Sequence, residues 1–195
     1  MIVSGYSRID TSLRPGSFLS VVYVSKEDGD SEYADEVSAN IRADIDSIDG
    51  VAVASKYGDP LLIPGLHKLL RKLKMPNRDL MLITSGSDYS VLDDLVGAGY
   101  VNYVDLVVDG PLDKSQQECI KILDNCGCPY MVTVEMIPGR ISESALKELA
   151  GSIDGSKHLI LKAGKTAERK FGEKELISLA NSVKGAARDV RLIAS

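Results

Sequence analysis

The chain has 195 residues, enough for a sizeable buried core, and we expect a single domain over residues 1–195. Hydrophobic residues make up 44% and charged residues 26%, a balance that excludes a wholly disordered chain. The net charge of −5 repels nucleic-acid phosphates, and the sequence has neither an apolar stretch of membrane length nor a signal-peptide pattern, so we expect a cytoplasmic protein that binds neither nucleic acid nor membrane.

Short runs rich in β-branched residues alternate with helical periodicity along the chain. The predicted strands are residues 19–25, 50–55, 79–85, 103–109, 129–137 and 157–163, with a short last strand at 189–193. A helical pattern of apolar residues follows each of the six longer strands. Asp113 with Gln116 predicts a capping box for the fourth helix, and Ser142 is the predicted N-cap of the fifth.

This alternation predicts a parallel α/β fold, and runs such as LMLIT and VDLVV suit strands that are apolar on both faces. Periodicity alone does not separate an open doubly wound sheet from a barrel or partial barrel, because both repeat the same unit. In either fold, ligands bind at the carboxyl ends of the strands. Functional residues are therefore expected in the loops that follow the strands.

The cysteines are few: Cys119, Cys126 and Cys128. They imply no disulfide framework. A single residue separates Cys126 from Cys128, which is too tight for the usual C-x-x-C pair, and neither histidine lies nearby. We therefore expect no metal site.

The segment VAVASKYGDPLLIPGLHKLLRKLK resembles a stretch of the radical S-adenosylmethionine (SAM) activating enzymes, in which a strand ends in Gly-Gly-Glu-Pro and continues as Leu-Leu-x-Pro-Gly-Leu. LMLITSGSDYSVLDDLVGAGYVNYVDLVVDGPL is similar to the next two units of that family, and VTVEMIPGRISESALKELA to its fifth. The opening segment resembles that of the activating enzymes of anaerobic ribonucleotide reductase and pyruvate formate-lyase. The resemblance implies an open or partial (β/α)6 TIM-like barrel of the radical SAM type.

The departures from this family concern its cofactor. Where the family carries C-x-x-x-C-x-x-C after the first strand, this chain reads SKEDGDSEYADE, and no cysteine occurs from residue 1 to residue 118. Three thiolates hold the family's 4Fe–4S cluster, and hard carboxylate oxygens bind such a cluster poorly. We therefore expect no iron–sulfur cluster, no radical chemistry, and at most weak SAM binding.

The resemblance also places a candidate ligand site at the strand ends. Its residues are Tyr57, Gly58, Asp59 and Pro60 in the Gly-Gly-Glu-Pro position, Ser85 and Gly86 after the third strand, Asp109 after the fourth, and Pro138 and Gly139 after the fifth. In the family, the Gly-Gly-Glu-Pro position holds the methionine amino group of SAM. Asp59 before Pro60 equally fits a cap at the start of a helix, with the proline in the first helical position.

The function expected from these observations is that of a non-redox, radical-SAM-like paralogue, a pseudoenzyme that binds a small ligand, a protein partner or a second copy of itself. One alternative is an enzyme that performs polar chemistry at the barrel mouth with Asp59, Asp105, Asp109 or Lys162. Another is an activating-enzyme-type protein that still binds SAM. The sequence identifies no catalytic residue.

Overall fold

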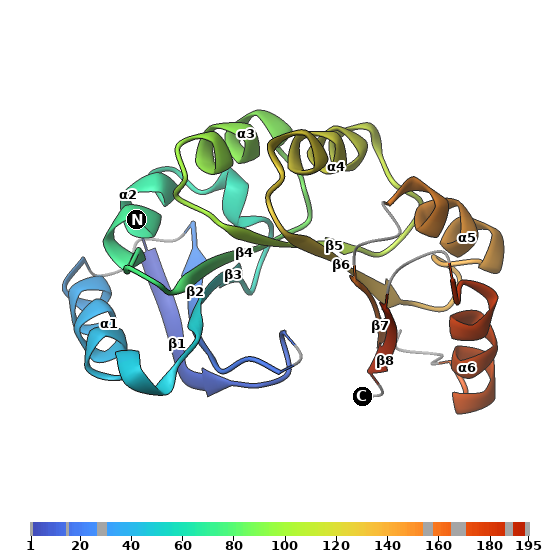
Figure 1. Cartoon of the computed structure of the whole chain (residues 1–195), viewed down its shortest axis with the longest axis horizontal. Coiled ribbons are helices and arrows are strands. Elements are labelled where there is room, and N and C mark those ends of the chain that lie inside the picture. Colours follow the sequence, from blue (N-terminus) through green and yellow to red (C-terminus); the bar gives the residue numbers. More distant parts are fainter. Residues whose placement is uncertain are drawn as a thin grey trace. The chain divides into compact units, whose positions relative to one another are not determined.

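The strands of the sheet follow one another in chain order, from β1 to β8 (Figure 1). This computed structural model describes residues 2–14, 16–26, 31–153, 158–164, 171–185 and 189–193. The sheet is open and mostly parallel. Its strand order has no switch point, which confirms the predicted open arrangement of successive β/α units rather than a doubly wound sheet.

Two compact units divide the chain, Met1–Val104 and Asp105–Ser195, and they are described separately. The expectation of a single domain over residues 1–195 remains a prediction.

The described residues of the first unit form four strands, three α-helices and two short 3-10 helices. Its strands are β1 (Ile2–Asp10), β2 (Leu19–Ser25), β3 (Gly50–Ser55) and β4 (Asp79–Thr84). Its helices are α1 (Ser31–Ala43), η1 (Ile45–Ser47), η2 (Pro60–Leu62), α2 (Leu66–Leu73) and α3 (Tyr89–Gly97). Strands β2, β3 and β4 are parallel, and α1, α2 and α3 lie on one side of them in Figure 1.

The strand β1 is absent from the predicted set. It pairs antiparallel with β2, and the pairing has two register shifts. Its sequence, IVSGYSRID, is interrupted by Gly5 and by serines, so its extended form depends on pairing with β2 more than on its own pattern. After it, the Asp10 carboxylate accepts hydrogen bonds from the N–H groups of Ser12 and Leu13, at 2.7 and 3.2 Å, which turns the chain back toward β2.

The second unit repeats the strand–helix alternation. Strand β5 (Tyr103–Val108) starts at the end of the first unit, and β6 (Tyr130–Met136), β7 (His158–Ala163) and β8 (Asp189–Ile193) follow. The helices are α4 (Lys114–Cys126), α5 (Glu143–Ser152) and α6 (Glu173–Ser182). Strands β6, β7 and β8 are parallel, and all three helices lie on one side of the strands of this unit (Figure 1).

The predicted caps are present. The Asp113 side chain accepts from the Gln116 N–H at 2.8 Å, and the Gln116 side chain accepts from the Asp113 N–H at 3.1 Å. The Ser142 hydroxyl accepts from the Ala145 N–H at 3.1 Å. The apolar residues Val37, Ile41, Ile45 and Ile48 have the spacing of one continuous helix, but α1 ends at Ala43 and the chain tightens into η1. The sequence therefore predicts the helix caps better than it predicts the helix lengths.

The apolar core lies between strands and helices in each unit. The β2 and β3 side chains are buried except for Tyr23, Ser25 and Ser55, which are half-buried. In the second unit, Leu123, Leu146 and Leu149 come from the helices and are also buried. Among the described residues, no helix combines the length and the apolar character that a membrane span needs.

Candidate functional site

The carboxylate of Asp59 is buried just after β3 and accepts hydrogen bonds from four residues. The Thr84 hydroxyl lies 2.7 and 2.8 Å from its two oxygens, and the Ser85 hydroxyl donates at 2.7 Å. The N–H groups of Leu61 and Ser87 donate at 2.9 and 3.0 Å. Asp59 therefore joins the end of β3 to the turn that follows β4.

These hydrogen bonds decide the charge state of Asp59. Burial acts to raise its pKa, but the N–H of Ser87, the hydroxyls of Thr84 and Ser85 and the N–H of Leu61 outweigh burial, so the pKa lies below its ordinary value. The carboxylate is ionised at neutral pH, and it caps η2. The expected cap at the start of a helix is present, with proline in the first turn.

The other candidate residues of the first unit surround this network. Gly86 has φ +76°, a left-handed conformation that glycine adopts without strain, and its N–H donates to the Thr84 hydroxyl at 3.0 Å. Pro60 is buried, whereas the Tyr57 side chain is 84% exposed, and Gly58 between them has φ +78°. The structure brings Asp59, Ser85 and Gly86 together and leaves the Tyr57 ring in solvent.

The candidate residues of the second unit lie at two strand ends. Asp109, after β5, forms an exposed ion pair with Arg140, which follows β6. Pro138 is buried, and Gly139 has φ +86° in the turn that leads to Arg140. The sequence interpretation missed Arg140; the signal was a basic residue directly after the Pro-Gly turn. An exposed pair of this kind contributes about 0–1 kcal/mol to stability.

A second polar cluster lies within β5, β6 and β7 and is centred on Asp105. This side chain is 3% exposed, and its Oδ1 has no hydrogen-bond partner within the described residues. Burial raises the pKa of Asp105 to about 7, although hydrogen bonds from Thr133 and the charge of Lys162 oppose the shift. The prediction that VDLVV is apolar on both faces is therefore wrong at Asp105.

The strand register shows which side chains share a face with this group. Glu135 lies opposite Lys162 in the parallel pair of β6 and β7, and Thr133 is two residues before Glu135. Because side chains alternate along a strand, Thr133, Glu135 and Lys162 lie on one face of the sheet. The other face carries buried apolar side chains such as Val132 and Val134. We call Asp105, Thr133, Glu135 and Lys162 the Asp105 site.

The same face carries an ion-pair cluster nearer the amino ends of β7 and β8. Asp189 lies opposite His158, with its carboxylate 3.4 Å from the imidazole Nδ1 and 2.5 Å from Nε of Arg191. This carboxylate is partnered, in contrast to Oδ1 of Asp105.

Sequence reasoning offered Asp105 and Lys162 as residues for polar chemistry and missed Thr133 and Glu135. The available signal was the alternation in VTVEM, where polar residues occupy every second position of a strand.

The three cysteines belong to the second unit and are not part of the Asp105 site. Cys119 is buried inside α4, Cys126 ends α4 and is exposed, and Cys128 is buried just before β6. None of the three forms a disulfide. Within the described ranges, no group of three or more His, Cys, Asp or Glu side chains is arranged to hold a metal ion. Residues 27–30 of the segment that replaces the family's cysteine loop lie outside the described residues.

Comparison with solved structures shows the fold. Archaeal TYW1 matches with a TM-score of 0.58 and 13% identity over 87% of this chain and 72% of that one. A type I 3-dehydroquinate dehydratase from Clostridium difficile, with covalent modified comenic acid, matches with a TM-score of 0.51 and 9% identity, over 80% of this chain and 70% of that one. No family model matches the chain, and no curated protein sequence is significantly similar to it. At these identities the likeness establishes an α/β fold of the TIM-barrel kind.

Proposed function

We propose that this protein is a non-redox, radical-SAM-like protein that binds a small polar ligand at the Asp105 site. The observation that carries the proposal is a buried carboxyl group whose Oδ1 has no partner among the described residues. A buried polar atom without a partner costs about 1–3 kcal/mol, and a bound ligand that donates a hydrogen bond would recover much of that.

The radical-SAM-like part of the proposal rests on the sequence resemblance and on the likeness to archaeal TYW1, a radical SAM enzyme. The non-redox part rests on the cysteines. Cys119 and Cys126 belong to one helix of the second unit, and Cys119 and Cys128 are buried. The residues present therefore do not fit a 4Fe–4S cluster bound as in that family, which needs three thiolates in one loop.

Weak SAM binding is part of the same proposal. The carboxylate of Asp59, in the position where the family holds the amino group of SAM, already accepts hydrogen bonds from Leu61, Thr84, Ser85 and Ser87. An ammonium group would have to displace some of these donors. Without a cluster to bind the amino and carboxylate groups, SAM loses its strongest contacts, and we expect micromolar to millimolar affinity at best.

The chemistry of the Asp105 site suggests the ligand class. Oδ1 of Asp105 needs a hydrogen-bond donor, while the exposed Lys162 ammonium offers three donors and a positive charge. A small hydroxy acid satisfies both, since its hydroxyl donates to Asp105 and its carboxylate accepts from Lys162. The hydroxyl of Thr133 beside Asp105 would help to orient such a ligand.

An enzyme that uses polar acid–base chemistry at the same residues is the second candidate. A carboxyl group with a pKa of about 7 exchanges its proton readily at neutral pH, as a general acid or base must. The structural neighbour named as a dehydratase has the same kind of fold. Catalysis and binding would then share one site, and turnover of the bound compound separates the two.

The test is a nuclear magnetic resonance (NMR) titration of the full chain with malate as the probe. We expect shifts confined to β5, β6 and β7, and at least about a tenfold loss of affinity in Asp105→Asn and in Lys162→Gln. Matched controls are Glu143→Gln and Lys121→Gln, because both residues are exposed on helices and lie outside the site. Binding that survives both site substitutions, or no binding by malate and related hydroxy acids, would contradict the proposal. A role for a protein partner or for self-association remains a prediction.

A further inference from the structure

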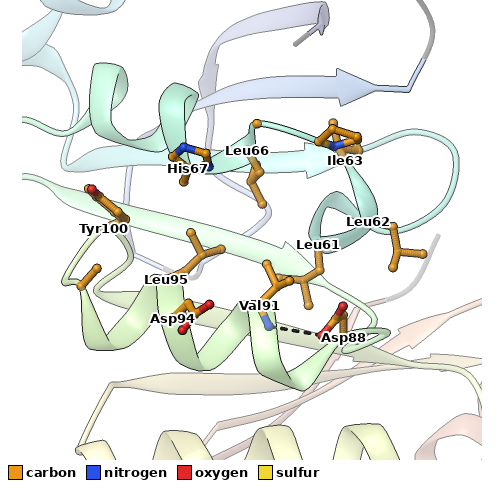
Figure 2. Close-up of a pocket in the computed structure, with 13 residues that line it drawn as sticks. Leu61, Leu62, Ile63, Leu66, His67, Asp88, Val91, Asp94, Leu95 and Tyr100 are labelled. Atoms are coloured by element: carbon orange, nitrogen blue, oxygen red, sulfur yellow. Dashed lines mark hydrogen bonds between the residues drawn. The ribbon is translucent and has the colours of Figure 1, made fainter.

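A cavity of about 710 Å³ opens in the first unit between the segment from η2 to α2 and the helix α3 (Figure 2). Pockets that hold small molecules usually have volumes of roughly 300–1,000 Å³. The larger apolar lining residues include Leu61, Leu62, Ile63, Leu66, Val91 and Leu95. We call this cavity the α2–α3 pocket; it lies outside the Asp105 site and its unit.

Local sequence keeps the pocket open. Gly65 caps α2 with φ +80°, so the chain turns sharply after Pro64 and separates η2 from α2. On the opposite wall, Ala98 ends α3 with a side chain of one methyl group. Leu62 remains 43% exposed at the rim although it is a large apolar residue. The leucine, isoleucine and valine side chains make the walls largely apolar. The methyl group of Ala98 is too small to fill the space between them.

Carboxylates lie on the α3 side of this apolar space. Figure 2 shows Asp94 on the same helix as Val91, with Asp88 at the start of that helix. The Asp94 side chain has no hydrogen-bond or ion-pair partner among the described residues. Asp88 uses Oδ1 to accept from the N–H groups of Ser90 and Val91 and keeps its negative charge.

We propose that the α2–α3 pocket binds a small primary amine with an apolar body, whose ammonium group lies against Asp94. The apolar body would contact residues such as Leu66 and Leu95, and the side chains of His67 and Tyr100 offer further polar contacts at the rim. Each additional methylene group buried in such a pocket strengthens binding about three- to fourfold.

The surface next to the pocket is cationic and would prefer an anionic ligand, so the test must distinguish amines from anions. A hollow of about 440 Å³ shares His67 with the pocket and is lined by Lys68, Arg71 and Lys72. An apolar carboxylate would favour this cationic side of α2, while an apolar amine favours the α3 side. The charge of the preferred probe therefore identifies the wall that binds it.

The experiment titrates the isotope-labelled full chain with n-hexylamine, n-hexanol and n-hexanoate at pH 7 and follows backbone amide shifts. We expect saturable shifts at Val91, Leu95 and Ala98, with hexylamine binding about two- to fivefold more tightly than hexanol because Asp94 is exposed to solvent. n-Butylamine should bind about tenfold more weakly than hexylamine, since two methylene groups are lost.

Three substitutions localise the effect. Asp94→Asn should abolish the preference for the amine over the alcohol, and Ala98→Phe should fill the pocket and remove binding of hexylamine and hexanol. Asp93→Asn is the matched control, because Asp93 is an exposed neighbour on α3 that does not line the pocket. Thermal melting of each variant checks that the fold is kept.

Two results would overturn the proposal. One is hexanoate shifting Val91, Leu95 and Ala98 with an affinity equal to that of hexylamine, which would assign the pocket to anions. The other is the absence of saturable shifts at Val91, Leu95 and Ala98 with every probe, which would leave the pocket without a small amphipathic ligand.

Discussion

The Thr84 hydroxyl lies 2.7 Å from Oδ1 and 2.8 Å from Oδ2 of Asp59, so one side chain at the end of β4 holds both oxygens of a buried carboxylate that follows β3. The same hydroxyl accepts from the N–H of Gly86 at 3.0 Å. Two neighbouring parallel strands are thus joined beyond their last paired residues.

Replacing Thr84 with valine should destabilise the protein by about 1–3 kcal/mol, because a buried charged acceptor loses its shared donor. Asp59→Ala should cost at least as much, since it also removes the cap of η2. Urea denaturation at pH 7 measures both, with Asp93→Asn as the exposed control. A Thr84→Val protein as stable as the parent would show that this network contributes little to the folded state.

Because of Asp105, the free energy of unfolding should fall as pH rises. A salt-bridged carboxylate has the opposite effect. Its pKa in the fold is about 7, above its value in the unfolded chain, so the folded state holds the proton more tightly. This contribution is fully present below the unfolded pKa of about 4 and is lost as pH rises to about 7, a change on the order of a few kcal/mol.

Asp105→Asn should therefore remove this pH dependence and be more stable than the parent at pH 8. Denaturation at pH 5 and pH 8 gives the stability, and carboxyl carbon NMR gives the pKa directly. A measured pKa near 4 for Asp105 would remove the support for the acid–base candidate.

Gly50 is expected to tolerate no side chain. A Cβ at this position would lie 2.4 Å from the carbonyl oxygen of Asp79, its partner across β3 and β4. Gly50→Ala should cost about 1–3 kcal/mol, because backbone must move to relieve the contact. Gly97→Ala is the matched control, since its Cβ would meet nothing within 4 Å, and it should be neutral or stabilising by about 0.5–1 kcal/mol. Equal melting temperatures for the two variants would show that the strands can separate at Gly50.

Anaerobic treatment with iron and sulfide should leave the protein colourless. Cys126 is exposed, while Cys119 and Cys128 are buried, so a thiol reagent should modify Cys126 in the native protein and the other two only after unfolding. A brown product with about four irons per chain would restore the redox alternative.

Much of the fold is readable from the sequence because its elements are locally specified. The strand at 79–85 ends within one residue of β4, and the capping box of Asp113 and Gln116 is present in α4. The strand β1 was missed because its geometry depends on pairing with β2. Local signals therefore predicted the elements that do not require a distant partner.

The candidate site is less predictable than the fold for the same reason. A cap before Pro60 follows from the order Asp-Pro, but the role of Thr84 and Ser85 as partners of Asp59 depends on which strands are neighbours. An aspartate inside VDLVV is visible in the sequence. The surroundings of this aspartate are not visible there, because they are formed by Thr133 and Lys162, which are more than twenty residues away along the chain. The sequence therefore does not show that Oδ1 of Asp105 lacks a hydrogen-bond partner among the described residues.

The chain-order pairing of β1, β2, β3 and β4 also has a consequence during synthesis on the ribosome. Each strand of the first unit finds its partner already made when it emerges, beginning with the β1–β2 hairpin. The connections between strands that are neighbours in the chain are short, and short connections close quickly. In a sheet with a switch point, a strand must wait until a later segment of the chain has been made. The nascent chain can therefore cover its apolar strands step by step, which shortens the time for which they are open to aggregation.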